Sequence, residues 1–159
     1  MPVKLVRTTA KPIQVSESAT VELRWDAAAM WSYMWNPASS VELGEHTEVG
    51  LTLPGTSYGL GEIQVFLHRL PDGRRQASLI EVVEFEPGRR AVTRSLVSAV
   101  PNLSVLTIEP LGPGSCRLTQ EHRADLPAGI QVAIVEECRK NFREELRQLM
   151  SRLTELTPR

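Results

Sequence analysis

The sequence predicts an α+β domain in which a curved antiparallel sheet of about seven strands packs against one long C-terminal helix. From residue 45 to residue 125, apolar and polar residues alternate almost throughout, which is the period of half-buried strands. After Leu126 and Pro127 the apolar spacing changes to four and three, which is typical of an amphipathic helix. The stretches between the strands have hairpin length, so neighbouring strands are expected to run antiparallel.

Length, charge and composition limit the classes of function. The chain has 159 residues, so we expect one domain over residues 1–159, with residues 1–12 as a loose N-terminal tail. Its net charge of −1 gives no electrostatic reason to expect nucleic acid as a partner. No apolar run approaches the roughly 18–20 residues that span a bilayer, and no signal peptide is recognisable, so we expect a cytoplasmic protein without integral membrane association. Cys116 and Cys138 are expected to be free thiols.

The N-terminal part predicts one strand followed by short helices. Val15–Trp25 is the expected strand, because apolar residues alternate toward its C-terminal end. Asp26 then has the position of an N-cap for a helix over Ala27–Trp35. Asn36 precedes a proline, which disfavours helical geometry and ends this helix. Residues 38–44 are expected to add one more short helical turn.

Six further strands are predicted between turns that contain proline or glycine. They cover residues 46–51, 61–69, 76–86, 89–100, 103–109 and 115–125. Between the first two of them, Gly59 and Gly61 have the spacing that begins a phosphate-binding loop. Because a strand follows Gly61 where such a loop needs a helix N-terminus, we expect a wide turn with Tyr58 at its surface.

The long C-terminal helix is expected over residues 128–154. One apolar stripe runs along it, and charged residues occupy the other sides. The stripe consists of Ile134, Cys138, Phe142, Leu146, Leu149, Leu153 and Leu156. A stripe of this length needs an apolar surface to cover it, and the concave face of the sheet is the only large one predicted.

This order of elements resembles the helix-grip fold of the START-like superfamily (SRPBCC), which includes polyketide cyclases and lipid-transfer domains. The resemblance rests on "VELRWDAAAMWSYMWNP", "PGTSYGLGE" and "VVEFEPGRRAV", and on the single long terminal helix. It covers nearly the whole chain and implies a mostly apolar cavity between sheet and helix that binds a hydrophobic small molecule, without a cofactor. The alternative is that large side chains fill this gap and nothing binds.

Strand and helix periodicity predicts which side chains face the cavity. On strand 115–125 we take the face with Leu118, Gln120 and His122 as the inner one, because the opposite face is wholly polar or charged. The candidate ligand contacts are Trp31, Trp35, Tyr58, Ile63, Val65, Leu118, Gln120, Val135 and Phe142. The alternative for the two tryptophans is core packing, and for His122 it is a structural role with a backbone partner.

His122, Glu81 and Arg94 are the weak candidates for catalysis. The alternation breaks between residues 80 and 84, so either Glu81 or Glu84 is the glutamate that points inward, where burial would raise its pKa. Arg94 alternates with two apolar residues and is a candidate to face a ligand carbonyl. The three histidines show no metal-ligand spacing, so we expect no metal site.

Three functional hypotheses remain open from the sequence. The first is a protein that binds a hydrophobic or aromatic small molecule, lipid- or polyketide-like, in its cavity. The second is an aromatase/cyclase that folds a poly-β-ketone and steers an aldol closure without a metal. The third is a protein-interaction module on the same fold. In each case we expect a monomer or a homodimer.

Overall fold

The computed structural model describes residues 10–156, so most of the expected N-terminal tail lies outside the described residues. Eleven elements follow one another in the order strand, short helices, six strands and long helix. They are β1 (Ile13–Leu23), α1 (Ala27–Trp35), the 3-10 turn η1 (Pro37–Ser39), α2 (Ser40–Leu43), β2 (Thr47–Thr52), β3 (Ile63–Arg69), β4 (Arg75–Glu86), β5 (Arg90–Ser95), β6 (Asn102–Gly112), β7 (Ser115–Leu126) and α3 (Val132–Glu155).

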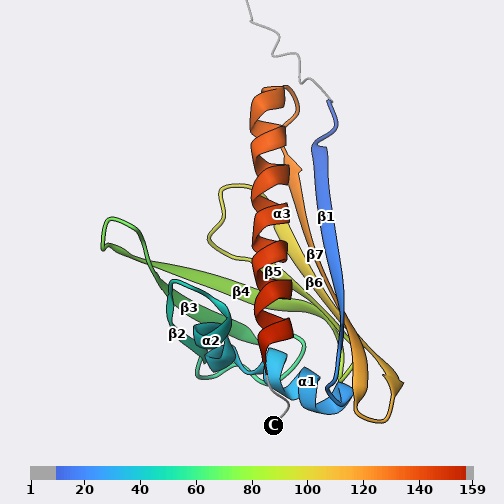
Figure 1. Cartoon of the computed structure of the whole chain (residues 1–159). Helices are drawn as coiled ribbons and strands as arrows, with labels where there is room; N and C mark the ends of the chain where they lie inside the picture. The colour runs from blue at the N-terminus through green and yellow to red at the C-terminus, as the bar shows by residue number, and fades with distance from the viewer. Residues whose placement is uncertain (1–9, 157–159) are drawn as a thin grey trace, which may run out of the picture.

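The seven strands form one antiparallel sheet in the order β1-β7-β6-β5-β4-β3-β2. The first and last strands pair along their whole length, from Ile13 opposite Leu126 to Leu23 opposite Cys116. The sheet curves around α3, so that β1, β7 and β6 run beside the helix while β2, β3 and β4 cross behind its lower half (Figure 1). The predicted α+β architecture is therefore confirmed.

Helix α1 forms where local signals predict it. The Asp26 carboxylate accepts hydrogen bonds from the backbone N–H groups of Ala28 and Ala29, at 3.1 and 3.4 Å, and so caps the first turn. At the other end Asn36 has extended dihedrals, and its side chain accepts a hydrogen bond from Ala38 at 3.1 Å as the chain enters η1. The helix buries Met30 and both of its tryptophans.

Replacing Asp26 with alanine is expected to lower the free energy of unfolding by about 1 kcal/mol, because two N–H groups of the first helical turn lose their acceptor. Urea unfolding followed by tryptophan fluorescence measures the change. Glu86→Ala is the matched control, because its ion pair with Arg89 is solvent-exposed and contributes little. Equal effects of the two substitutions would contradict the capping role.

Two apolar clusters hold opposite ends of α3 against the sheet. The lower cluster joins Leu153 of α3 to α1 and to the lower halves of β6 and β7, and Leu118 and Ile108 are fully buried in it. The upper cluster joins Val135 to Val15 and Leu126. Burial of these side chains stabilises the position of the helix without requiring that the space between the clusters be filled.

The structure differs most from the sequence prediction at two boundaries. Helix α3 begins at Val132 and not at residue 128, because residues 127–131 form a turn in which Gly129 has a φ of +83°. The apolar stripe consequently starts at Val135, whereas Ile134 is 47% exposed. Strand β5 ends at Ser95, five residues before the predicted end. None of the described helices has the length and apolar character that a membrane-spanning segment requires.

Candidate functional site

A cavity of about 380 Å³ lies on the concave face of the sheet, beneath α1, η1 and α2. Six strands, β2 to β7, and the short helices contribute to its wall, whereas α3 contributes only Leu149. The apolar part of the lining consists of Met34, Trp35, Leu43, Phe66, Ile80, Ala91, Leu106 and Leu149. The polar part consists of Ser39, Ser40, Thr47, Gln64, His68, Thr93, Ser104, Gln120 and His122, with the backbone of Gly44.

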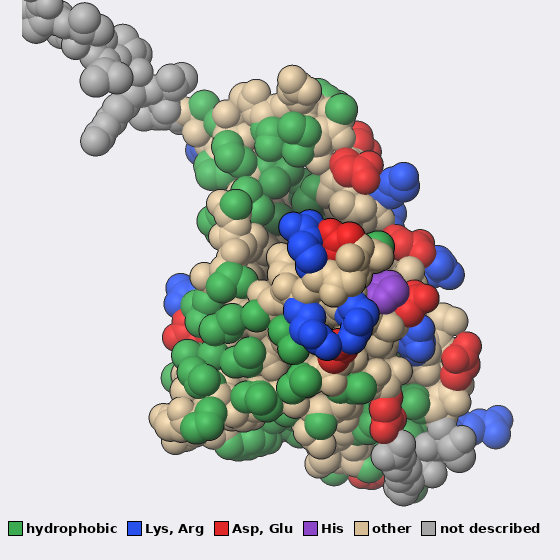
Figure 2. Space-filling model, turned by 90° about the vertical axis from the view of Figure 1, so that its left-hand side faces the viewer, with side chains coloured by type: hydrophobic (Ala, Val, Ile, Leu, Met, Phe, Trp, Pro, Cys, Tyr) green, Lys and Arg blue, Asp and Glu red, His purple; other side chains and the backbone are tan. Residues whose placement is uncertain are grey.

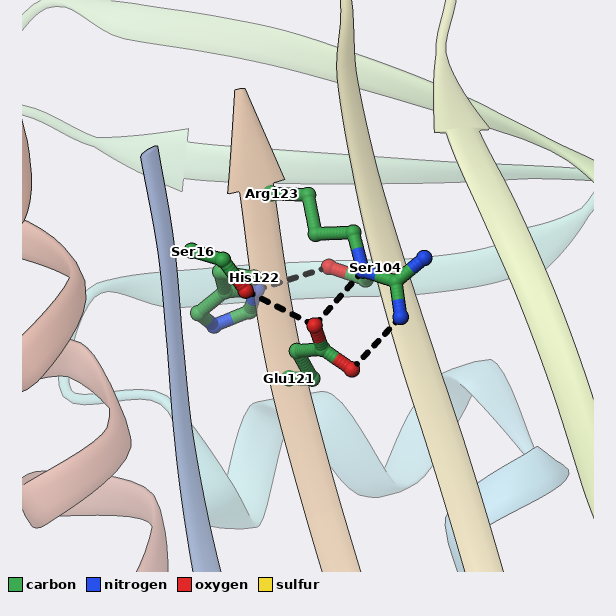
Figure 3. Close-up of polar contacts among 5 residues, drawn as sticks. All are labelled: Ser16, Ser104, Glu121, His122 and Arg123. Atoms are coloured by element: carbon green, nitrogen blue, oxygen red, sulfur yellow. Dashed lines mark hydrogen bonds and ion pairs between the residues drawn. The ribbon is translucent and has the colours of Figure 1, made fainter. Parts of the chain in front are cut away.

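His122 lies at one end of the cavity and is positioned by its neighbour on β6. Ser104 stands directly opposite His122 in the sheet register, and its hydroxyl lies 2.8 Å from Nδ1 (Figure 3). The other ring nitrogen, Nε2, lies 3.8 Å from a carboxylate oxygen of Glu145, which is too far for a hydrogen bond. Burial lowers the pKa of His122, so the imidazole is neutral at neutral pH.

The neighbouring residue on β7 shows how the alternation separates the two faces of the sheet. The Glu121 carboxylate points away from the cavity and accepts hydrogen bonds from Arg123 at 2.6 Å and from Ser16 at 2.7 Å (Figure 3). The hydrogen bond from Arg123 holds the pKa of Glu121 below its usual value, although partial burial opposes this. Charge therefore lies on the outer face of β7, and the neutral imidazole lies on the inner face.

His68, the second histidine of the cavity, is fully bonded to the protein. Its Nδ1 lies 3.1 Å from the Thr47 hydroxyl and its Nε2 lies 2.8 Å from the Ser78 hydroxyl. Burial lowers its pKa, so this ring is also neutral at neutral pH. Because both ring nitrogens are occupied, His68 has a structural role in the cavity wall.

The Gln120 amide and Nε2 of His122 are two polar groups of the cavity wall without a hydrogen-bond partner among the described residues. Gln120 is 8% exposed, and its amide makes no hydrogen bond with any residue in the range 10–156. Within the same range, Nε2 of His122 has no partner at hydrogen-bonding distance. By contrast, the nearby Gln64 amide donates to the Trp35 carbonyl at 3.3 Å and to Glu62 at 3.1 Å. Neither group is fully enclosed by protein, so both remain accessible to a ligand.

Glu81 and Arg94, two of the predicted catalytic residues, do not face the cavity. They stand opposite each other on β4 and β5, and form an ion pair on the outer face of the sheet. Glu84 also lies outside and pairs with Arg90 at 2.5 Å. The break in the alternation is real, because the register shifts between Val82 and Glu84. This bulge leaves both carboxylates outside, so the prediction that one of them points inward is wrong.

The prediction for β3 is also wrong, because the opposite face of this strand lines the cavity. Gln64, Phe66 and His68 point inward, whereas Ile63 and Val65 are absent from the cavity lining. The outer-face residues pack instead beside apolar neighbours of β2 and β4, since Val65 stands opposite both Leu51 and Leu79. In Figure 2, apolar side chains cover one flank of this end of the molecule, beside a group of arginine and acidic side chains. The apolar residues on the outer face of β3 are the reason that this face was assigned to the interior.

The other predicted contacts fall into four places. Trp35 and Gln120 line the cavity. Leu118 is fully buried in the lower apolar cluster, while Val135 and Phe142 belong to the upper one. Trp31 and Tyr58 line a separate surface depression together with Trp35, so the glycine-rich turn does not border the main cavity. The residues that periodicity missed, above all Ser104 and Gln64, carry no signal in the sequence that separates them from surface polar residues.

Within the described residues no cluster of three or more His, Cys, Asp or Glu side chains is arranged to hold a metal ion. Both cysteines are free thiols, and Cys116 is buried in the lower cluster. Burial raises the pKa of the Cys116 thiol, so it is protonated at neutral pH and is not a nucleophile.

Comparison with known proteins identifies the fold. No protein-family model matches the chain, and no curated protein is similar in sequence. Among solved structures, the di-domain ARO/CYC StfQ from the steffimycin biosynthetic pathway matches with a TM-score of 0.71 at 12% identity, over 90% of this chain and 50% of that one. A START superfamily protein from Mycobacterium smegmatis matches with a TM-score of 0.67 at 17% identity, over 89% and 99% of the two chains.

A norcoclaurine synthase from Thalictrum has a similar structure, with a TM-score of 0.64 at 10% identity over 91% of this chain and 94% of that one. The chain therefore spans about the whole length of two of these proteins and half the length of the di-domain one. Identities this low carry information on the fold and not on the activity. Together with the seven-stranded sheet curved around a long terminal helix, these matches show that the chain has a helix-grip fold, similar to that of the START superfamily protein.

Proposed function

We propose that the protein binds a hydrophobic or aromatic small molecule in the cavity on the concave face of the sheet. The observation that carries this proposal is that the Gln120 amide and Nε2 of His122, which have no hydrogen-bond partner among the described residues, lie in the wall of a largely apolar cavity. A ligand with an apolar body and one hydroxyl or carbonyl group would form a hydrogen bond with one of them, which contributes roughly 0.5–1.5 kcal/mol. The binding unit is the single domain formed by the chain.

The size and composition of the cavity support this proposal. Its volume of about 380 Å³ lies in the range of small-molecule pockets, and its wall combines aliphatic and aromatic groups with a few polar groups. An interaction module with a filled interior, the third hypothesis, is disfavoured by this open space. The similar structures include a polyketide ARO/CYC and a START superfamily protein, which supports a small-molecule ligand as a class.

An aldol-type cyclase is the second candidate function, and the Ser104–His122 pair favours it. If Nδ1 donates its proton to the Ser104 hydroxyl oxygen, Nε2 is an unprotonated base that faces the cavity. This nitrogen would remove a proton from a methylene between two carbonyls of the ligand. The resulting carbanion would attack another carbonyl of the same molecule, and the alkoxide formed would take the proton back from the imidazolium. The Gln120 amide would hold the enolate oxygen by donating a hydrogen bond.

Native mass spectrometry of the protein purified from its own source tests the binding proposal directly. A co-purifying small molecule is expected, and 2-naphthol is expected to bind the emptied protein more tightly than naphthalene, because only the naphthol reaches Gln120 and His122. Gln120→Leu should weaken 2-naphthol binding about five- to tenfold and leave naphthalene binding unchanged, as expected for one hydrogen bond. Thr119→Val on the outer face of the same strand is the control. Failure of both probes to bind, with no co-purifying molecule, would overturn the proposal.

A further inference from the structure

A second depression, of about 360 Å³, lies beside α1 and the glycine-rich turn and shares only Trp35 with the main cavity. Its wall is unusual because three aromatic rings and a carboxylate occupy most of it. The lining consists of Trp31, Ser32, Trp35, Asn36, Thr52, Tyr58 and Glu62.

The aromatic rings are held in fixed positions by one another. Trp31 and Trp35 stack with an interplanar angle of 3° and 5.2 Å between ring centroids. Tyr58 stands edge-on to Trp35, with 6.2 Å between the rings, and its hydroxyl accepts a hydrogen bond from Nε1 of Trp31 at 3.1 Å. Phe85 contacts all three rings at centroid distances of 5.0–5.8 Å. The faces of such rings carry negative electrostatic potential.

The turn that brings Tyr58 to this position needs glycine. Gly59 has a φ of +99°, and a Cβ at this residue would lie 2.9 Å from the Phe85 ring. The backbone therefore packs directly on Phe85, which places Tyr58 over the two tryptophans. Tyr58, which the sequence indicated as a candidate contact of the main cavity, is thus part of a different, aromatic-lined surface.

Glu62 is a buried carboxylate in the floor of this depression, with 2% of its surface exposed. Oε2 accepts hydrogen bonds from Nε1 of Trp35 at 2.9 Å and from the Gly59 N–H at 3.0 Å. Oε1 accepts from the Thr52 hydroxyl at 3.0 Å and from the Gln64 amide at 3.1 Å. Burial alone would raise its pKa, but these hydrogen bonds outweigh burial and hold the pKa below the usual value.

The charge of Glu62 has no counter-charge. All four hydrogen-bond donors are neutral, and no Lys, Arg or His in residues 10–156 forms an ion pair with this carboxylate. Buried charges are normally paired, so a carboxylate without an ion-pair partner, at the edge of Trp35 and in a depression lined by three aromatic rings, makes this depression attractive to a cation.

We propose that this depression binds an organic cation, and specifically a fully alkylated ammonium group. A carboxylate has about four acceptor positions, and protein donors already occupy all four at Glu62. A primary ammonium would lose hydration without finding an acceptor there, whereas a quaternary ammonium needs none. Contact with aromatic rings, close to a carboxylate that has no ion-pair partner, is the recognition that such a group uses.

Choline and its neutral carbon isostere, 3,3-dimethylbutan-1-ol, are the probes for this proposal. The experiment follows the indole N–H resonances of Trp31, Trp35 and Trp25 by NMR during titration of the full chain. Choline is expected to shift the signals of Trp31 and Trp35 in a saturable way and to leave that of Trp25 unchanged. The neutral alcohol should bind at least about fivefold more weakly, because it lacks the cation–π attraction.

Two substitutions of Tyr58 distinguish the contribution of its aromatic ring to choline binding from that of its hydroxyl group. Tyr58 is 62% exposed, so Tyr58→Ala is expected to leave the fold intact while it weakens choline binding about three- to fivefold. Tyr58→Phe keeps the aromatic face and should bind choline within about twofold of the parent protein. Equal affinity for choline and the neutral alcohol, or no saturable shift at Trp31 and Trp35, would overturn the proposal. Thr93→Phe, which obstructs only the main cavity, should leave choline binding unchanged. The proposal for the depression and the proposal for the main cavity can therefore be tested separately.

Discussion

Replacing Glu62 with alanine is expected to lower the free energy of unfolding by about 3 kcal/mol or more. The substitution leaves four donors without their acceptor, among them the buried Nε1 of Trp35 and the buried N–H of Gly59. Each buried donor without a partner costs roughly 1–3 kcal/mol, and the glycine-rich turn also loses its attachment to α1. Urea unfolding monitored by circular dichroism measures the loss.

Glu81→Ala is the matched control for this substitution. Glu81 is also a glutamate of the sheet, but it lies on the outer face of β4, and its ion pair with Arg94 is solvent-accessible. Such a pair contributes between roughly 0 and 1 kcal/mol, so the control should unfold almost like the parent protein. If the two alanine variants lost the same stability, this would contradict the role of the Glu62 carboxylate in joining the glycine-rich turn to α1 through its hydrogen bonds.

The same carboxylate predicts a dependence of stability on pH. The pKa of Glu62 in the folded protein is lower than its ordinary value of 4.5, so the folded state binds the proton less tightly than the unfolded state does. Its contribution is therefore fully present above about pH 4.5 and is lost as the pH falls through the folded-state pKa. The Glu62→Gln variant cannot titrate at this position. Its free energy of unfolding should therefore fall less steeply than that of the parent protein between about pH 5 and about pH 3. An unchanged slope would contradict this assignment.

The second large expected effect is the loss of ligand binding when the main cavity is filled. Thr93 lies on the inner face of β5 and lines the cavity, so a phenylalanine at this position would extend its ring into the empty space. We expect Thr93→Phe to weaken the binding of 2-naphthol at least about tenfold, because the ligand would have to displace the new ring. Fluorescence titration measures the affinity, and urea unfolding checks that the variant is folded.

The adjacent residue of the same strand provides the control. Arg94→Phe adds the same ring to the outer face of β5, where it replaces only an exposed ion pair with Glu81. Binding of 2-naphthol should then stay within about twofold of the parent protein, as expected for a residue outside the pocket. A similar loss of binding in both variants would show that the ligand does not occupy the concave face.

Local sequence signals predicted most of the elements because each signal acts over a few residues. Asp26 and the Asn36–Pro37 pair mark the two ends of α1, and both act through the backbone of the neighbouring turn. The alternation of β7 likewise identified its inner face, since one side of that strand is wholly polar or charged and only the other side can be buried.

The same reasoning failed on β3 because both faces of that strand carry a mixture of residues. Ile63 and Val65 appeared suited to the interior, yet the strand turns Gln64 and His68 inward, where hydroxyl and carbonyl groups from other elements satisfy them. A period of two divides the side chains of a strand into two sets but does not state which set is buried. Only pairing with β2 and β4 settles that choice.

The sequence by itself determined the order, type and approximate bounds of the helices and strands, and therefore the fold class, because periodicity, caps and turn residues are local properties of the chain. The tertiary structure alone decided which polar groups meet. It placed Glu81 with Arg94 outside, brought His122 beside Ser104 in the wall of the cavity, and surrounded Glu62 with four neutral donors. These contacts join residues far apart in the sequence, and their energies depend on burial and on distances that no local pattern encodes.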